Sequence, residues 1–351
     1  MDRSNDHDPA SGAPGTKRVL VTGVAGFIGH AVALRLLDQG YSVAGIDSIT
    51  DYYDVRLKHD RLARLNGRNR YAFHQTDICD LGKLADIFAA FRPTHVIHLA
   101  AQAGVRYSIT NPHVYVQSNL VGFTNIIDQS RLHGVEHFVY ASTSSVYGAN
   151  TQMPFSVSQN TDHPLTLYAA SKKANELMAH SFSNIFALPT TGLRFFTVYG
   201  PWGRPDMMMT IFADAIMQGR PVPLFNAGHM ERDFTYIDDI VEGVVRSCWV
   251  TATPNRAWSG DAPDSASSAA PYRIYNIGNG QPVQVLRVVE LLEQNFGRKA
   301  ERDLLPMQPG DVPATFADIS ELSRATGFKP DTSIEVGVAA FVDWYKTYRN
   351  V

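Results

Sequence analysis

The chain has 351 residues, of which 44% are hydrophobic and 19% are charged, a composition typical of a globular protein with a sizeable core. Its formal net charge of -3 predicts no general attraction to nucleic acid or to an anionic membrane surface, and we expect neither partner. No apolar run approaches the length of a membrane-spanning helix. The only cysteines, Cys79 and Cys248, form no disulfide framework and favour a reducing, cytoplasmic setting.

Residues 1–16 are rich in Asp, Ser, Gly and Pro and lack the apolar core of a signal peptide, so we expect a disordered tail. From Lys17 onward, short apolar runs alternate with segments of helical spacing. This alternation predicts an α/β fold, a Rossmann-like doubly wound parallel sheet that occupies residues 17–200. Strands are predicted at 17–23, 41–47, 70–78, 94–101, 135–143 and 188–200, and helices at 26–40, 55–65, 81–91, 111–132 and 167–182.

After about residue 200 the predicted strands become short. They lie at 222–225, 233–237 and 272–278, among helices that include 209–219 and 288–297. We interpret residues 201–351 mainly as a smaller α/β lobe that binds the substrate and closes over the first lobe, with crossovers between the two. Residues 253–272 are rich in Ser, Ala, Pro and Asp, which predicts a mobile surface loop inside this second lobe.

The segment VTGVAGFIG places Gly23, Gly26 and Gly29 between a strand and a helix. Such glycines allow a tight turn and bring the backbone close to a pyrophosphate at the helix N-terminus. Asp47, at the end of the second strand, can accept hydrogen bonds from a ribose 2'-hydroxyl and repels a 2'-phosphate, which favours NAD over NADP. Asp77 is a candidate for the adenine end, with an ordinary surface carboxylate as the rival interpretation. The predicted cofactor-binding residues are Gly23, Gly26, Phe27, Ile28, Gly29, Asp47, Asp77, Ile78, Leu99, Ala100, Ala101 and Lys172.

Tyr168 and Lys172 lie four residues apart in LYAASKKANELMAHSF and therefore on one face of a helix. A lysine ammonium near a phenol favours the phenolate, as does a positively charged nicotinamide ring. A phenol with an ordinary pKa of about 10 can then serve as an acid or base at neutral pH. The Tyr-x-x-x-Lys spacing is common in ordinary helices, but the NAD pattern and the hydroxyl-rich strand end ASTSSVYG favour a catalytic interpretation here.

These segments together resemble the extended short-chain dehydrogenase/reductases, and within them the nucleotide-sugar epimerases. The resemblance covers nearly everything from Lys17 onward and rests on VTGVAGFIG, HLAAQAGVR, ASTSSVYG, YAASK, RFFTVYGPWGRPDM and RDFTYIDD. DYYDVRLKHDRL and GPWGRPDM are most similar to the UDP-glucuronate 4-epimerases. The resemblance implies an isomerase that converts UDP-glucuronate to UDP-galacturonate through a 4-keto intermediate. It also implies tightly held NAD and a homodimer formed by helices around residues 114–127 and 172–186.

The resemblance also implies roles for individual residues. Tyr168 would be the acid/base, Lys172 would hold the nicotinamide ribose and tune Tyr168, and Thr143 would hydrogen-bond the 4-oxygen of the sugar. Arg232 matches a diphosphate-binding arginine, and Arg106 is a second candidate.

Farther along, QPGDV differs from the resembled pattern. Gln308 stands where related epimerases often carry an arginine, which puts one contact to the diphosphate in doubt. Asp311 in the same segment is a candidate to reach the uridine ribose.

The triplet at 143–145 reads TSS, whereas sugar 4,6-dehydratases resemble TDE there and UDP-glucuronate decarboxylases resemble TSE. Oxidation of glucuronate at C4 produces a β-keto acid, which loses CO2 when its C5–C6 bond aligns with the carbonyl π system. Neutral hydroxyls can hold the carboxylate out of that alignment without adding an anion. We predict that Ser144, Ser145 and Thr197 bind the carboxylate and that Arg204 contributes charge. Local capping is the alternative for the serines, and a surface or diphosphate role is the alternative for Arg204.

No metal site is predicted, because His95 and His98 face opposite sides of a strand and no cysteine or acidic partner accompanies them. Three other functions remain open. One is 4-epimerisation of a neutral or N-acetylated UDP-hexose, which a panel of UDP-sugars distinguishes. Another, from a different class, is a non-catalytic NAD-binding sensor or scaffold, which full turnover by Tyr168→Phe would favour. The third is a dehydrogenase that carries out a net oxidation or reduction, whose turnover would require added cofactor.

Overall fold

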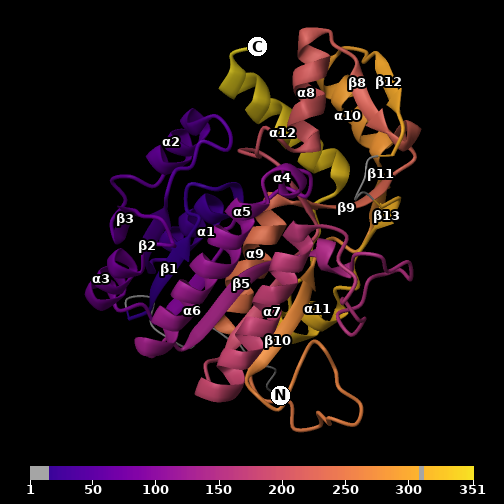
Figure 1. The fold of residues 1–351 in the computed structure, drawn as a ribbon. Coiled ribbons are helices and arrows are strands. Elements are labelled where there is room, and N and C mark those ends of the chain that lie inside the picture. Colours follow the sequence, from indigo (N-terminus) through magenta and orange to yellow (C-terminus); the bar gives the residue numbers. More distant parts are fainter. Residues whose placement is uncertain (1–15, 308–311) are drawn as a thin grey trace, which may run out of the picture.

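The computed structural model describes residues 16–307 and 312–351. Most of the expected tail and both Gln308 and Asp311 lie outside these residues. Within the described chain, the largest sheet has seven parallel strands in the order β10-β6-β5-β4-β1-β2-β3 (Figure 1), which confirms the doubly wound α/β fold. The strands are β1 (Arg18–Thr22), β2 (Ser42–Asp47), β3 (Tyr71–Gln75), β4 (His95–His98), β5 (His137–Thr143), β6 (Thr190–Phe195) and β10 (Tyr272–Ile277).

Helices cover both faces of this sheet because successive residues of each strand point to opposite faces. Val19 and Val21 of β1 belong to an apolar cluster with residues of α1 (Phe27–Asp38), α9 (Ile237–Trp249) and α11 (Ser320–Thr326). Leu20, between the two valines, joins the opposite cluster with residues of α3 (Leu81–Phe91), α6 (Phe123–Leu132) and α7 (Leu167–Phe186). The α2 helix (Val55–Ala63) follows β2.

The predicted helix over 111–132 is interrupted by a π-helical stretch. Residues 112–132 form α5 (Pro112–Tyr115), the π-helix η1 (Val116–Gly122) and α6 in succession, and the short helix α4 (Tyr107–Thr110) precedes them. In η1, whose turns are wider than those of an α-helix, the backbone carbonyl of Asn119 accepts a hydrogen bond of 2.6 Å from the Asn175 side chain of α7. Such π-helical stretches are frequent at functional sites.

The remaining elements form a smaller lobe around its own core. Its helices and strands are β7 (Thr197–Tyr199), α8 (Met208–Gln218), β8 (Val222–Phe225), β9 (Glu231–Tyr236), β11 (Pro282–Gln284), α10 (Val285–Phe296), β12 (Arg302–Leu305), β13 (Ala314–Thr315) and α12 (Ile334–Arg349). β9 pairs with β7, β11 and β13, and β12 pairs with β8. Phe212, Leu224, Phe234, Leu292 and Phe341 are buried in the core between them.

The expectation that residues 272–278 belong to this smaller lobe is wrong. These residues form β10, which pairs in parallel with β6 of the large sheet, and α9 packs in the core beneath that sheet. The chain therefore leaves the large sheet after β6, builds part of the second lobe and returns. Sequence periodicity identified the strand correctly but carries no information about which distant strand pairs with it.

The segment 253–272 extends from the surface beside β10 (Figure 1) and leads into the large sheet, not into the second lobe as expected. Its second half is tied to the body of the protein. The Ser265 hydroxyl donates to the Val157 carbonyl at 3.1 Å. Within the segment, Asn255 donates to the Ser267 hydroxyl at 3.0 Å and so joins its two halves. Its mobility stays a prediction. Over the described ranges, none of the helices combines the length and apolar character needed to cross a bilayer.

Candidate functional site

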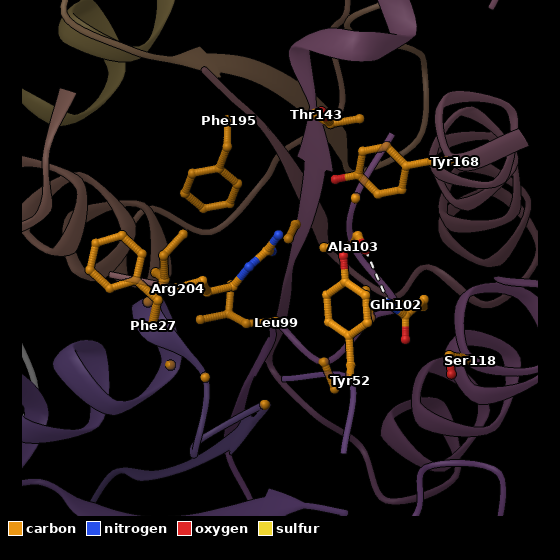
Figure 2. A pocket seen from close by; sticks show the side chains of 18 of the residues that line it. Phe27, Tyr52, Leu99, Gln102, Ala103, Ser118, Thr143, Tyr168, Phe195 and Arg204 are labelled. Atoms are coloured by element: carbon orange, nitrogen blue, oxygen red, sulfur yellow. Dashed lines mark hydrogen bonds between the residues drawn. The ribbon is translucent and has the colours of Figure 1, made fainter. Parts of the chain in front are cut away.

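A cavity of about 450 Å³ opens at the carboxyl ends of the strands of the large sheet (Figure 2). In open α/β sheets this edge, at the point where the strand order reverses, is where ligands bind. Every predicted cofactor-binding residue lines the cavity. So do seven of the predicted catalytic and substrate-binding residues: Thr143, Ser144, Ser145, Tyr168, Lys172, Thr197 and Arg204.

The glycine turn between β1 and α1 is too tight for side chains. A Cβ on Gly23 would lie 2.8 Å from the backbone nitrogen of Ala100, and one on Gly29 would overlap the Gly23 carbonyl oxygen. Asp47 fixes the turn from the side, since its Oδ2 accepts a hydrogen bond of 3.0 Å from the Ala25 amide. Its Oδ1 accepts one of 2.8 Å from the Ile49 amide. A carboxylate has lone pairs left for a ribose hydroxyl after these two contacts.

Tyr168 enters the cavity from the first turn of α7, which Thr166 caps by accepting a hydrogen bond from the Ala169 amide. Figure 2 shows its hydroxyl directed into the pocket. Burial raises the pKa of Tyr168, while a hydrogen bond with Thr143 and the positive charge of Arg204 lower it. The influence of Arg204 on this phenol was not expected from the sequence. The expectation that Lys172 tunes Tyr168 stays a prediction.

Lys172 lies one turn farther along α7 and is 2% exposed. Its ammonium donates a hydrogen bond of 3.4 Å to the Asn175 side chain. Burial lowers the pKa of Lys172 to about 8, and the negative charge of Glu176 acts in the opposite direction. Lys172 is thus a buried cation that remains mostly protonated at pH 7 but gives up its proton at a lower pH than an exposed lysine does.

Asn119, in the π-helical stretch, joins the elements around these two residues and was not identified from the sequence. Its side chain accepts a hydrogen bond of 2.8 Å from the Gln102 amide and donates one of 3.0 Å to the Ser171 hydroxyl. It therefore ties α7 to the segment after β4 that lines the cavity. No sequence pattern marks this asparagine, because its partners are distant along the chain.

The hydroxyls after β5 have two functions. The Thr143 side chain accepts a hydrogen bond of 3.2 Å from the Ser145 amide, so it caps the 3₁₀ turn Ser144–Tyr147. Its hydroxyl also donates to the Ser145 hydroxyl at 3.2 Å. Thr143 therefore caps this turn, and Thr143, Ser144 and Ser145 all line the cavity. The carboxylate-binding roles of the two serines stay predictions.

Arg204 projects its guanidinium toward the middle of the pocket in Figure 2. Asp206 accepts hydrogen bonds of 2.9 and 2.7 Å from its Nε and Nη2, and also accepts one of 3.1 Å from the Tyr52 hydroxyl. Tyr52, Tyr53 and Lys58 line the cavity but were not predicted individually. The signal was present, because all three lie in the aromatic and basic segment DYYDVRLKHDRL.

Two predicted arginines are not among the residues that line the cavity. The Arg106 guanidinium lies 5.4 Å from the centre of the Phe225 ring. Arg232 donates hydrogen bonds of 2.8 and 3.2 Å to the carbonyls of Glu231 and Pro313. Their diphosphate-binding roles stay predictions, as does the role of Asp311, which lies outside the described residues. Within 16–307 and 312–351, no group of three His, Cys, Asp or Glu side chains is placed to hold a metal ion.

The family model described as the NAD dependent epimerase/dehydratase family matches residues 19–278. The chain belongs to this family. Its relatives include Protein CapI of Staphylococcus aureus, which is 52% identical over 94% of this chain and 99% of its own length. A probable UDP-glucuronate 4-epimerase of Rhizobium meliloti is 50% identical over 95% of this chain and 98% of its own.

Among solved structures, the epimerase/dehydratase resembles the UDP-glucuronic acid 4-epimerase of Bacillus cereus in complex with UDP-glucuronic acid and NAD. The TM-score is 0.81 at 30% identity, over 94% of this chain and 99% of that one. The family resemblance expected from the sequence motifs is confirmed, and with it the expectation of NAD.

The geometry of the epimerase/dehydratase site fits NAD. Gly23, Gly26 and Gly29 place no side chain between the N-terminus of α1 and the cavity. Asp47 and Ile78 line the same cavity as Tyr168 and Lys172. The turn would hold a pyrophosphate and Asp47 the adenosine ribose. This arrangement directs the nicotinamide end of the cofactor toward the tyrosine–lysine pair.

Proposed function

We propose that this family member interconverts UDP-glucuronate and UDP-galacturonate by epimerisation at C4. The observation that carries the proposal is the composition of the cavity around Tyr168. Ser144, Ser145, Thr197 and Arg204 line it there. The acidic residues that line the described cavity, Asp47 and Asp77, follow β2 and β3, on the far side of β1 from β5. Among the lining residues at the catalytic end, a carboxylate-bearing sugar would therefore meet neutral hydroxyls and the Arg204 guanidinium, whose Nε and Nη2 pair with Asp206 outside the lining.

Tyr168 is the proposed acid and base. In the forward reaction it takes the proton of the 4-hydroxyl while Thr143 holds the same oxygen. NAD, when bound, supplies the acceptor and donor for the hydrogen at C4. Burial opposes formation of the phenolate, so the hydrogen bond with Thr143 and the charge of Arg204 assist proton transfer. Lys172, four residues farther along α7, is proposed to assist as well. After the sugar ring turns over, Tyr168 returns the proton to the oxygen.

Retention of the substrate carboxylate is the second requirement. Once C4 is a ketone, the sugar is a β-keto acid that loses CO2 if its C5–C6 bond aligns with the carbonyl. Ser144, Ser145 and Thr197 would hold the carboxylate as neutral donors, and the planar guanidinium of Arg204 would bind it at two points. The named relatives that act on UDP-glucuronate support this choice of substrate.

We also infer a homodimer in the cytoplasm, with residues 17–200 mainly binding NAD and 201–351 mainly binding the UDP-sugar. Large apolar side chains are exposed along η1 and α7, among them Val121, Leu177 and Ile185. A second copy packed on these helices would bury them. Light scattering of the wild type and of Leu177→Glu tests the dimer. The two unpaired cysteines support the location.

The decisive experiment is incubation of the purified protein with UDP-glucuronate, without added NAD, followed by separation of the products. UDP-galacturonate should accumulate, and Tyr168→Phe should abolish its formation while the fold is retained. The proposal is overturned if UDP-glucuronate is left unchanged while a neutral or N-acetylated UDP-hexose is epimerised. Full turnover by Tyr168→Phe would likewise exclude the assigned mechanism.

A further inference from the structure

Arg61, in α2, is a fully buried arginine whose hydrogen-bond acceptors are all neutral. Its Nη1 donates to the Ala25 carbonyl at 3.1 Å and to the Tyr53 hydroxyl at 2.6 Å. Its Nε and Nη2 donate to the Trp202 carbonyl at 3.1 and 2.6 Å, and Nη2 also reaches the Gly203 carbonyl at 3.3 Å. Within the described chain, no carboxylate forms a hydrogen bond or ion pair with this guanidinium. Burying a cation in this way is costly, so the contacts it makes need an explanation.

The carbonyls that Arg61 contacts belong to the two segments that build the site. Ala25 lies in the glycine turn, where Asp47 accepts a hydrogen bond from the Ala25 amide. Trp202 and Gly203 immediately precede Arg204. One guanidinium thus connects the cofactor-binding turn to the backbone that carries the arginine proposed to bind the substrate carboxylate.

The segment around Trp202 needs such support. Trp202 has a φ of +67°, in the left-handed region that residues other than glycine rarely adopt. Its ring is held by the Arg64 guanidinium at 5.0 Å and by Trp344 and Tyr348, whose ring centres lie 5.6 and 5.3 Å away. Arg61 fixes the carbonyl of the same residue. The backbone before Arg204 is therefore held from both sides.

The chemistry of arginine suits this task. A guanidinium carries its donors in a rigid plane, so segments bonded to its different nitrogens keep a fixed separation. A lysine ammonium has one nitrogen and cannot reach both segments with the same geometry. Burial lowers the pKa of Arg61, and the charges of both Asp47 and Arg204 act on it.

We propose that Arg61 is a positioning residue that couples cofactor retention to recognition of the charged sugar. A well-ordered glycine turn would hold the Arg61 guanidinium in place through the Ala25 carbonyl. The guanidinium would in turn fix the backbone of residues 200–207 and with it the position of Arg204. This inference rests on the proposed function, because it assigns Arg204 to the substrate carboxylate.

Arg61→Lys tests the coupling, with Arg56→Lys as the matched control. Both changes replace arginine by lysine on α2, but Arg56 is exposed and pairs with Asp54. Dissociation constants are measured for UDP-glucuronate and for UDP, which lacks the carboxylate, together with the NAD released per protein. Arg61→Lys should weaken UDP-glucuronate binding roughly tenfold or more, leave UDP binding within about twofold of the wild type and lower the NAD content. Arg56→Lys should change none of these.

Equal weakening of UDP and UDP-glucuronate would reduce Arg61 to a structural residue and overturn the inference, as would no weakening of either. If the wild type does not convert UDP-glucuronate, the proposed function fails at that step, before any variant is considered. Amide hydrogen exchange of residues 200–207 in the wild type tests the coupling independently. It needs no variant, so it remains a test if Arg61→Lys does not fold. Removal of NAD should speed exchange in this segment, and an unchanged rate would contradict the coupling.

Discussion

Arg194 donates two hydrogen bonds to the Glu176 carboxylate, 2.8 Å from Nε and 2.9 Å from Nη2, and both side chains are buried. The same carboxylate accepts a hydrogen bond of 2.6 Å from the Ser142 hydroxyl. Three elements meet here, because Glu176 lies on α7, Ser142 on β5 and Arg194 on β6. The pair thereby sets the position of the helix that carries Tyr168 relative to the strand that ends at Thr143.

Removal of the negative charge by Glu176→Gln should destabilise the protein strongly. Arg194 would remain buried without its anion, a change that typically costs about 3–5 kcal/mol. Denaturant unfolding measures this loss. The control is Glu321→Gln, which breaks the exposed ion pair with Arg324 and should cost no more than about 1 kcal/mol. Equal losses for the two variants would show that burial of the pair has no special importance.

Lys172 should make stability depend on pH in a definite direction. Burial lowers the pKa of its ammonium from 10.5 to about 8. The folded protein therefore loses this proton before the unfolded chain does, so the destabilisation is full below pH 8 and is relieved between about pH 8 and 10. In NAD-free protein, Lys172→Met should be more stable than the wild type at pH 7, by about 3 kcal/mol, and this advantage should shrink toward pH 10.

Unfolding curves at several pH values measure the difference between the two proteins. The variant should have no epimerase activity, so stability and function would move in opposite directions. A difference that does not vary with pH would contradict a lowered pKa at Lys172.

Loss of the two serine hydroxyls should redirect the reaction. In Ser144→Ala and Ser145→Ala the carboxylate would lose neutral donors, so part of the oxidised sugar should lose CO2 and leave a UDP-4-keto-pentose. The loss of a hydrogen bond to a charged group costs about 1.5–3 kcal/mol, which corresponds to about a tenfold or larger rise in KM. Captured CO2 and mass spectrometry of the products measure the effect. Ser156→Ala, at an exposed serine bonded to Ser158, is the control. Normal epimerisation without CO2 release in both serine variants would refute the assigned role.

Gly29→Ala should abolish cofactor binding, because the added Cβ would overlap the Gly23 carbonyl and force the turn apart. Gly82→Ala is the matched change in an open position of α3, where the nearest atom lies 3.6 Å from the new Cβ. That control should be neutral or gain roughly 0.5–1 kcal/mol, since alanine favours helix over glycine. The NAD content and melting temperature of both proteins are compared. Retention of NAD by Gly29→Ala would contradict a pyrophosphate site at this turn.

The features that the sequence predicted well are local. Val19, Leu20 and Val21 form a continuous apolar run because both faces of β1 are covered, and Gly23 and Gly29 follow at the spacing of the turn. The ends of β1, β2 and β5 carry the cofactor and catalytic groups, so the order of strands along the chain already places these groups at one edge of the sheet.

The features that the sequence missed depend on partners far along the chain. Arg61 is a charged residue in a polar helix, a pattern typical of a solvent-exposed position, and only the fold brings the Trp202 carbonyl onto it. The role of Asn119 could not be predicted from the sequence either, because the π-helical stretch around it depends on its contacts with α7. Arg106 and Arg232 were assigned by motif alone, and motif position did not bring either side chain to the cavity wall.

The return of the chain to the large sheet has a consequence for synthesis on the ribosome. When residue 200 has been made, β6 has an open edge, and the apolar undersurface of β1 lacks α9 with its buried Ile240 and Val244. The apolar surface waits for α9, which ends at Trp249, and the sheet edge waits until Ile277, at the end of β10, has left the exit tunnel. Over that interval the nascent protein exposes a sheet edge and an uncovered apolar surface, the features that promote aggregation. A gene cut after codon 200 would therefore encode an aggregation-prone fragment instead of a separable cofactor-binding unit.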